Sequence, residues 1–288
     1  MFVVAGVSGN TGSVVAETLL AKGQKVRVVV RDAAKGLAWT EKGAEVAVAD
    51  LDDAPALTRA LEGARGAYLL VPPTPATPDL AAQQKKTVDA LVSAAKTAKV
   101  PHVVLLSSVA AHLAAGTGPI RGLHVAEEEL AKANVPFTAV RAAYFLENWA
   151  SSLGALPNGV LPTFLAKDQA IPMVATADIG RVAAEALLEG PKGPVNVVEL
   201  AGPVDLSPTD IARELTALVG KPITVSEGPL DALVPTLTGF GLGKSMAEAY
   251  LEMTAGVRSG VVTFEGKGTR LVRGTTTARE VLTRLTAR

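Results

Sequence analysis

Near its start the chain reads Val3-Val4-Ala5-Gly6-Val7-Ser8-Gly9-Asn10-Thr11-Gly12, a β-branched run that leads into three glycines spaced three residues apart. A strand, such a loop and then a helix are typical of the first βα turn of a Rossmann-type domain. Gly6 permits the tight turn, Gly9 lets backbone approach a pyrophosphate, and Gly12 lets the helix pack close to the strand. The stretch therefore predicts an α/β fold built on a doubly wound parallel sheet.

The same loop is a predicted phosphate site. The backbone amides of Asn10 and Thr11 fall at the beginning of the predicted helix, where unpaired donors and the helix dipole favour an anion. The cofactor-binding residues that we expect here are Gly6, Ser8, Gly9, Asn10, Thr11 and Gly12. An ordinary glycine turn is the alternative, but its place in the first βαβ unit of the chain favours nucleotide binding.

Up to residue 150, short β-branched runs alternate with longer alanine-rich stretches of helical period, which is typical of βα units around a parallel sheet. The predicted strands are Phe2–Ala5, Lys25–Val30, Glu45–Val48, Ala67–Val71, His102–Leu106 and Pro136–Val140. The predicted helices between them are about Thr11–Lys22, Ala34–Lys42, Pro55–Glu62, Leu80–Ala98 and His124–Ala133. We assign residues 1–152 to an NAD(P)-binding Rossmann domain.

The alternation loosens after residue 150. Leu153–Leu165 is rich in Gly, Pro and Leu and predicts a loop across the carboxyl edge of the sheet. Ala177–Glu189 predicts a helix, and Val195–Leu200 predicts a late strand of the main sheet. We expect about 175–203 to rejoin the Rossmann domain, and 153–174 with 204–288 to form a smaller α+β substrate-binding lobe.

Charge and composition limit the partners. Lys+Arg and Asp+Glu number 28 each, so no basic excess favours nucleic acid. The chain has no cysteine, and its histidines lack the spacing of metal ligands, so we expect neither disulfides nor a metal. A strand at Phe2 leaves no room for a signal peptide, and no apolar run reaches about 18 residues, so we expect a cytoplasmic protein without a membrane span.

Arg31 follows the second predicted strand, at the position that normally distinguishes the two nicotinamide cofactors. An acid there accepts a hydrogen bond from the ribose of NADH, whereas an arginine accommodates the 2′-phosphate of NADPH. Lys35 adds a second cation one turn later. Asp32 keeps NADH open as the less favoured alternative, but guanidinium–phosphate pairing favours NADPH.

Two further strand ends are predicted to contact the cofactor. Asp50 and Leu51 follow the third strand, where an adenine ring would rest and its amino group would meet Asp50. Val71 and Pro72 end the fourth strand, beside the pyrophosphate and ribose. All four lie on the rim where open α/β sheets bind ligands, although each position alone is equally compatible with a plain edge loop.

A series of segments resembles the NmrA-like family, atypical relatives of the short-chain dehydrogenases that include quinone and triphenylmethane reductases and redox-sensing regulators. The segments are Gly6–Gly12, Arg31, Leu106–Ser108, Val135–Arg141, Tyr144–Asn148 and Ala177–Gly180. The resemblance implies a Rossmann domain, a smaller carboxyl-terminal lobe, and a cleft between them for an aromatic or quinone-like substrate. It also implies that the segment from Ala142 to Phe145, which includes Tyr144, lines the nicotinamide.

The chain departs from standard short-chain dehydrogenases at their Tyr-x-x-x-Lys pair, in which lysine lowers the pKa of the tyrosine that serves a carbonyl. None of Tyr68, Tyr144 and Tyr250 has a lysine four residues later, and Leu123 falls about where that lysine would be. Hydride transfer to a quinone or conjugated acceptor needs less acid help, because the acceptor delocalises the charge.

His124 is our first candidate for a proton donor and Tyr144 our second, while Ser107 is a candidate hydrogen-bond partner of substrate or cofactor. Structural alternatives are that His124 starts a helix, that Tyr144 is a core or cleft-wall aromatic, and that Ser107 caps the next segment. We expect Glu127–Glu129 to form a solvated helix face, and Asp178 to orient a loop or a helix start.

The sequence thus favours an NADPH-dependent oxidoreductase, monomeric or homodimeric, that acts on a quinone-like or other conjugated aromatic acceptor. A non-catalytic NADP(H)-binding redox sensor is the alternative, because fold and cofactor motif do not establish chemistry. A nucleotide-sugar isomerase or epimerase is disfavoured by the missing tyrosine–lysine pair.

Overall fold

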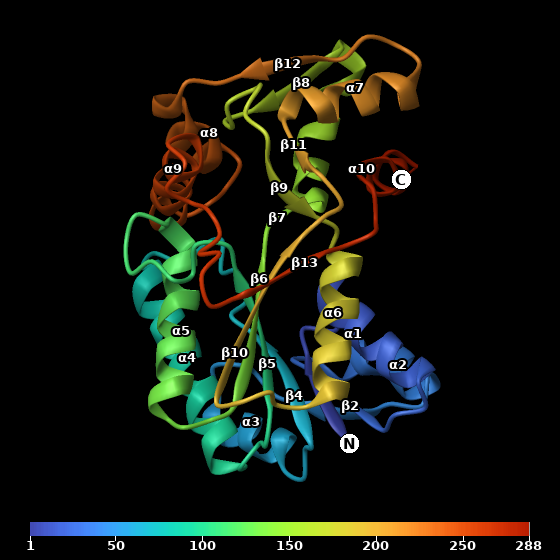
Figure 1. Cartoon of the computed structure of the whole chain (residues 1–288), viewed down its shortest axis with the longest axis vertical. Coiled ribbons are helices and arrows are strands. Elements are labelled where there is room, and N and C mark those ends of the chain that lie inside the picture. Colours follow the sequence, from blue (N-terminus) through green and yellow to red (C-terminus); the bar gives the residue numbers. More distant parts are fainter. Residues whose placement is uncertain (288) are drawn as a thin grey trace.

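The computed structural model describes residues 1–287 and is built around an eight-stranded sheet (Figure 1). The strand order is β13-β10-β6-β5-β4-β1-β2-β3, and the neighbouring strands pair in parallel. The strands are β1 (Phe2–Ala5), β2 (Val26–Val30), β3 (Glu45–Val48), β4 (Gly66–Leu70), β5 (Val103–Ser108), β6 (Phe137–Ala142), β10 (Val195–Ala201) and β13 (Arg270–Arg273). The predicted doubly wound parallel sheet is confirmed.

Helices cover both faces of this sheet. On one face, α1 (Asn10–Ala21) and α6 (Thr176–Glu189) bury apolar residues against Phe2 and Val4. On the other face, Val3 and Ala5 pack with three helices: α3 (Ala54–Leu61), α4 (Leu80–Thr97) and α5 (Arg121–Lys132). Alternate residues of β1 thus enter opposite cores, which is why the strand is apolar throughout.

Every predicted strand and helix up to residue 150 exists, with small differences at the ends. The stretch predicted as the helix Ala34–Lys42 consists of a 3₁₀ turn, η1 (Ala33–Gly36), followed by α2 (Leu37–Glu41). The short 3₁₀ turn η2 (Gly118–Ile120) precedes α5. Because α5 begins at Arg121, His124 lies within its first turns rather than at its start.

The prediction of a loop at Leu153–Leu165 is wrong. This stretch contains the second part of a 3₁₀ segment, η3 (Leu146–Asn158), and a strand, β8 (Val160–Thr163). Leu156 and Leu161 enter a separate core there, together with Trp149. The gain from burying these side chains outweighs the weak local preference of a sequence rich in Gly and Pro.

The separate core belongs to the smaller lobe. The smaller lobe contains two small sheets, one ordered β11-β9-β7 and the other β12-β8. Its remaining elements are β7 (Tyr144–Phe145), β9 (Ile171–Val174), β11 (Asp205–Leu206), α7 (Pro208–Val219), β12 (Thr224–Glu227), η4 (Leu230–Ala232), α8 (Leu233–Gly239), α9 (Lys244–Arg258) and α10 (Ala278–Thr286).

Two segments depart from the predicted division into lobes. Residues 144–152, which we assigned to the Rossmann domain, include β7 and the start of η3, whose Leu146 and Trp149 join the core of the smaller lobe. We assigned all of 204–288 to the smaller lobe, but β13 pairs with β10 at the edge of the main sheet. Its sequence, Arg270-Leu271-Val272-Arg273, is short and half charged, so only its distant partner identifies it as a strand of that sheet. The predicted return of Val195–Leu200 to the main sheet holds as β10, between β6 and β13.

Within residues 1–287, no helix combines the length and the apolar character that crossing a bilayer requires.

Candidate functional site

The glycine loop has the geometry that its sequence predicts. Gly6 adopts a φ of 68°, a left-handed conformation that favours glycine, and the Gly9 amide donates to the Gly6 carbonyl at 2.9 Å. A Cβ on Gly12 would lie 2.5 Å from the Gly6 oxygen and 2.6 Å from the Ala5 oxygen. Only glycine therefore lets α1 start so close to the end of β1.

The start of α1 is open to a ligand. Gly9 is its N-cap and makes no side-chain capping bond, and Ser8, Gly9 and Asn10 are exposed. Thr11 is buried, and its hydroxyl accepts a hydrogen bond from the Tyr68 phenol at 2.9 Å, so Thr11 offers its backbone rather than its side chain. Exposed glycine backbone with uncapped amides at a helix start fits a pyrophosphate.

The cations beyond β2 are available for a further phosphate. Arg31 and Lys35 are both exposed, and neither forms an ion pair among residues 1–287. Asp32, the acid that favoured NADH, accepts a hydrogen bond from the Ala34 amide at 2.9 Å and so caps η1. Its carboxylate already serves the turn, and the positive side chains on either side of it fit a 2′-phosphate.

The other predicted cofactor residues lie on the same rim. The sheet order places the carboxyl ends of β4, β1, β2 and β3 next to one another. Asp50 is exposed and accepts from the Asp52 amide at 3.1 Å, while Leu51 is buried. Val71 and Pro72 directly follow β4 and are half-buried. The structure thus gathers these four positions around the glycine loop, and their contacts with a cofactor remain predictions.

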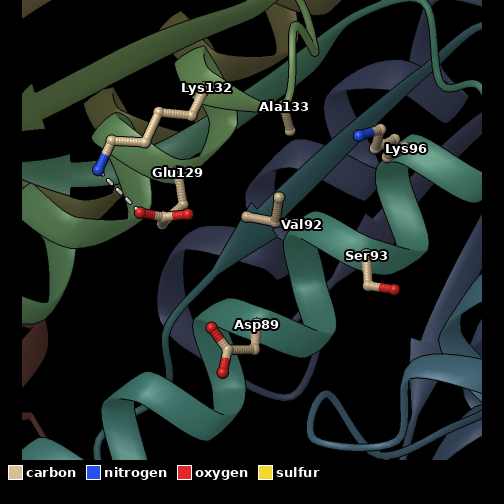
Figure 2. Close-up of a pocket in the computed structure, with 7 residues that line it drawn as sticks. All are labelled: Asp89, Val92, Ser93, Lys96, Glu129, Lys132 and Ala133. Carbon is tan, nitrogen blue, oxygen red and sulfur yellow. Dashed lines mark hydrogen bonds and ion pairs between the residues drawn. The ribbon is translucent and has the colours of Figure 1, made fainter.

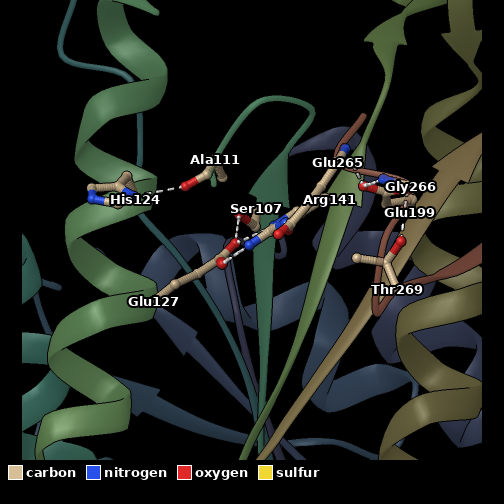
Figure 3. A network of polar contacts seen from close by, with 9 residues as sticks. All are labelled: Ser107, Ala111, His124, Glu127, Arg141, Glu199, Glu265, Gly266 and Thr269. Carbon is tan, nitrogen blue, oxygen red and sulfur yellow. Dashed lines mark hydrogen bonds and ion pairs between the residues drawn. The ribbon is translucent and has the colours of Figure 1, made fainter. Parts of the chain in front are cut away.

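Ser107 lies in a buried polar network (Figure 3). It is 2% exposed, and its hydroxyl donates to Glu127 at 2.5 Å. Arg141 binds the same carboxylate twice, with Nη2 at 2.6 Å and Nε at 3.1 Å. The hydroxyl proton of Ser107 is therefore directed to Glu127 and away from the predicted substrate or cofactor.

The prediction that Glu127 belongs to a solvated helix face is wrong. Its side chain is buried, because α5 packs this face onto the sheet and Arg141 neutralises the carboxylate there. Burial alone would lower the pKa of Arg141, but its pairing with Glu127 and Glu265 raises it overall. Glu128 is exposed, as expected, and Glu129 is half-buried.

Asp178 behaves as the sequence predicts. It is buried in the first turn of α6, where its carboxylate accepts from the Thr276 amide and hydroxyl, both at 3.0 Å. It thereby holds the segment that leads into α10.

His124 has one ring nitrogen in a hydrogen bond. Nδ1 donates to the Ala111 carbonyl at 2.9 Å (Figure 3). Nε2 lies 3.6 Å from the Glu128 carboxylate. Because a carbonyl only accepts, Nδ1 carries a proton and Nε2 is the nitrogen that can exchange one. The contact with Ala111 also ties α5 to the loop after β5.

Tyr144 belongs to an aromatic group that extends into the smaller lobe. Its ring lies 6.2 Å from that of Trp149, at an angle of 59°. Burial raises the pKa of Tyr144 to about 12; repulsion from an ionised Tyr250 phenol adds to the rise, and a hydrogen bond with Asn148 opposes it. Tyr250 comes from α9, and its pKa is also raised by burial.

Sequence reasoning missed Tyr250. Met246, Tyr250 and Val257 have helical spacing, which indicates α9 but not the partial burial of the Tyr250 phenol. No hydrogen bond or ion pair within residues 1–287 joins Ser107, His124 and Tyr144 to one another, so the three candidates occupy separate positions. Ala142 is buried at the end of β6, and its carbonyl accepts from the Val109 amide at 2.8 Å.

A shallow hollow lies elsewhere, between α4 and α5 (Figure 2). It is lined by Asp89, Val92, Ser93, Lys96, Glu129, Lys132 and Ala133, and Lys132 pairs with Glu129 there at 2.9 Å. None of the predicted site residues lines it. The part of the chain that the structure describes contains no cluster of three or more His, Asp or Glu side chains fit to hold a metal ion.

Comparisons with known proteins show which proteins this chain resembles. A model of the NmrA-like family matches residues 1–266. The chain is 28% identical to NAD(P)H azoreductase of Xenophilus azovorans over 261 residues, which cover 88% of this chain and 86% of that protein. It is 31% identical to quinone oxidoreductase 2 of Escherichia coli (strain K12) over 268 residues, which cover 90% of this chain and 89% of that protein.

Among solved structures, the NADPH-dependent quinone oxidoreductase of Escherichia coli complexed with NADPH has a TM-score of 0.82 at 27% identity. The match covers 99% of this chain and 100% of that one. The likeness therefore extends over both lobes.

Proposed function

The chain belongs to the NmrA-like family, and from this premise we propose that it is an NADPH-dependent oxidoreductase that passes hydride to a quinone-like or other conjugated aromatic acceptor. Two relatives that match most of its length are an NAD(P)H azoreductase and a quinone oxidoreductase. The proposal rests on the glycine loop, in which a Cβ on Gly12 would overlap backbone oxygens, and on Arg31, which follows β2 and has no ion-pair partner within residues 1–287.

In this proposal, different residues of the chain bind different parts of the cofactor. Amides at the start of α1 bind the pyrophosphate, and Arg31 with Lys35 binds the 2′-phosphate. Asp50 and Leu51 receive the adenine, while Val71 and Pro72 border the ribose and pyrophosphate. Bound NADPH supplies the hydride.

The acceptor lies, in our proposal, beside the nicotinamide and against the Ala142–Phe145 segment, where β6 of the main sheet passes into β7 of the smaller lobe. Its own conjugation spreads the incoming charge, so the protein mainly orients the two rings. The Tyr144 hydroxyl stays protonated at neutral pH, because burial raises its pKa to about 12, and can donate a hydrogen bond to a developing anion. His124, the first candidate from the sequence, can donate a proton from Nε2 when both of its ring nitrogens are protonated.

The proposal is tested by mixing the purified protein with NADPH and a panel of quinones, azo dyes and triphenylmethane dyes. Loss of nicotinamide absorbance is followed with NADPH and, in parallel, with NADH. We expect sustained turnover with at least one acceptor and a preference for NADPH. Tight NADPH binding without turnover across the panel would instead indicate a redox sensor.

Two substitutions separate the candidate proton donors. Tyr144→Phe should lower kcat/KM for the acceptor about fivefold, the equivalent of one hydrogen bond of about 1 kcal/mol, and leave the NADPH Kd unchanged. His124→Gln should have the larger effect if Nε2 provides the proton. The control for both is the Kd for NADPH, which neither proton donor is expected to set.

A further inference from the structure

Residues 109–117, which we call the β5 loop, begin against the segment where we place the acceptor. The Val109 amide donates to the Ala142 carbonyl at 2.8 Å, and Ser108 lies opposite Ala142 in the pairing of β5 with β6. Neighbouring strands of a sheet lie about 4.8 Å apart. The β5 loop therefore starts beside the Ala142–Phe145 segment.

A turn and one side chain fix the first part of the β5 loop. The Ala111 amide donates to the Ser108 carbonyl at 3.1 Å, and the Ala111 carbonyl accepts from His124 Nδ1 at 2.9 Å (Figure 3). A turn of this kind keeps its two end residues within about 7 Å of each other. His112 is the next residue, about 3.8 Å farther along the backbone, so it is held close to the end of β5.

Ala110 carries backbone strain in the same loop. Its φ is 63°, a left-handed conformation that disfavours residues with a Cβ, and the residue is fully buried. Two other non-glycine residues of the described chain, Lys99 and Asn134, also have positive φ, but each lies just past the end of a helix, where that conformation is common. Such strain costs about 1–3 kcal/mol and concentrates at functional sites. The strain in Ala110 therefore points to a function for the residues beside it.

The ring of His112 has no hydrogen-bond or ion-pair partner within residues 1–287, and its Nδ1 is buried. The other two histidines differ in this respect. The buried His102 contacts the Thr138 hydroxyl through Nε2 at 2.9 Å, and His124 bonds the Ala111 carbonyl. His112 itself is half-buried, so its Nδ1 edge is covered and its Nε2 edge can be reached.

The free edge of His112 fits a hydrogen-bond acceptor. A neutral imidazole has one N–H donor and one bare nitrogen, and Nε2 donates in the tautomer that carries its proton there. A quinone has carbonyl oxygens, which only accept. The β5 loop thus presents an unused ring nitrogen close to the segment against which we place the acceptor.

We propose that His112 is a further acceptor-binding residue, whose Nε2 donates a hydrogen bond to a carbonyl oxygen of a quinone-like acceptor beside the Ala142–Phe145 segment. This proposal rests on the function proposed above, because that function places the acceptor there. The contact favours acceptors with a carbonyl oxygen over conjugated dyes that have none.

His112→Leu is a suitable perturbation, because it removes the donor and keeps an apolar side chain at a half-buried position. The ring makes no hydrogen bond within residues 1–287, so none is lost from the fold and the variant is expected to fold. His112→Gln keeps an N–H donor near the position of Nε2. The matched control is Leu113→Ala, which shortens the next side chain of the β5 loop, also half-buried, and leaves the donor in place.

The first measurement is steady-state kinetics with a quinone and with a triphenylmethane dye whose only polar atoms are dialkylamino nitrogens. In His112→Leu, KM for the quinone should rise about fivefold, the equivalent of one hydrogen bond of about 1 kcal/mol. KM for the dye and the NADPH Kd should stay within about twofold. His112→Gln should keep KM for the quinone within about twofold of wild type, and Leu113→Ala should change none of these quantities.

The second measurement is the Kd for the quinone without NADPH, followed by quenching of tryptophan fluorescence. Trp149 is a suitable reporter, because its ring lies 6.2 Å from that of Tyr144. This Kd should rise about fivefold in His112→Leu and should be restored in His112→Gln.

The proposal is overturned if His112→Leu binds the quinone as wild type does, if it weakens quinone and dye equally, or if His112→Gln is as weak as His112→Leu. An equal effect of Leu113→Ala would also overturn it, because packing of the loop would then be the cause. A wild-type protein that binds the quinone without reducing it would end the proposed function alone, and the Kd values would still decide the role of His112. A wild-type protein that binds no quinone would end both.

Discussion

Arg31→Ala is the substitution that tests the cofactor preference most directly. The side chain is exposed and forms no ion pair within residues 1–287, so its loss should change the free energy of unfolding by no more than about 0.5 kcal/mol. A hydrogen bond to a charged group is worth about 1.5–3 kcal/mol, and each 1.4 kcal/mol is about tenfold in Kd. Because Lys35 remains, we expect the lower part of that range, a rise of about tenfold to thirtyfold in the NADPH Kd.

The assay is a titration of the apo protein with NADPH and NADH, followed by nicotinamide fluorescence at two ionic strengths. NADH lacks the 2′-phosphate, so its Kd should stay within about twofold, and added salt should weaken NADPH binding more in wild type than in the variant. Arg59→Ala is the matched control, since Arg59 is exposed on α3 and also forms no ion pair in the described chain. Equal weakening of both cofactors, or an unchanged NADPH Kd, would refute the assignment of Arg31 to the 2′-phosphate.

Three further outcomes are expected. Gly12→Ala places a Cβ 2.5 Å from a backbone oxygen, so it should destabilise the fold by about 1–3 kcal/mol and raise the NADPH Kd. Gly154→Ala is the control, because a Cβ there meets nothing within 4 Å and should change neither quantity. The melting temperature and a titration with NADPH measure the two effects. Ser107→Ala removes one donor from Glu127 and should cost about 1 kcal/mol in urea unfolding, with kcat unchanged within about twofold; a large fall in kcat would instead return Ser107 to the reaction. Burial lowers the pKa of His102 from 6.5 to about 4, so between these pH values the unfolded chain binds a proton that the folded chain does not. The free energy of unfolding should therefore fall as pH drops from 6.5 to about 4, and His102→Gln should flatten that part of the profile; parallel profiles for the two proteins would contradict this cause.

Prediction from sequence succeeded where the signal is local. The glycine spacing in Gly6–Gly12, the apolar runs of β1 to β6 and the periodicity of the helices each depend on residues within one or two turns of one another. The positions of Arg31, Asp50 and Val71 followed from the same order, since each directly follows a strand whose place in the sheet is set by the fold.

The polar interior of the site could not be predicted in this way. Glu127 belongs to a run of three glutamates, and a charge run on a helix is normally solvated. Its burial depends on Arg141, which is 14 residues away, and on the packing of α5 against the sheet. The role of Ser107 was missed for the same reason. We expected it to contact substrate or cofactor, but its hydroxyl donates to Glu127, which lies on another element.

The sequence by itself determined the glycine turn and the parallel sheet that carries it. Both depend on short-range backbone geometry and on periodic burial, which residues close together in the chain specify. What only the tertiary structure decided is the arrangement beyond it: β13 at the edge of the sheet, and the segment before β13 held by Glu199 and by the pair of Glu265 with Arg141. These contacts join residues that are far apart in the chain, and the register of β5, β6 and β10 brings Ser107, Arg141 and Glu199 side by side only when the whole sheet forms.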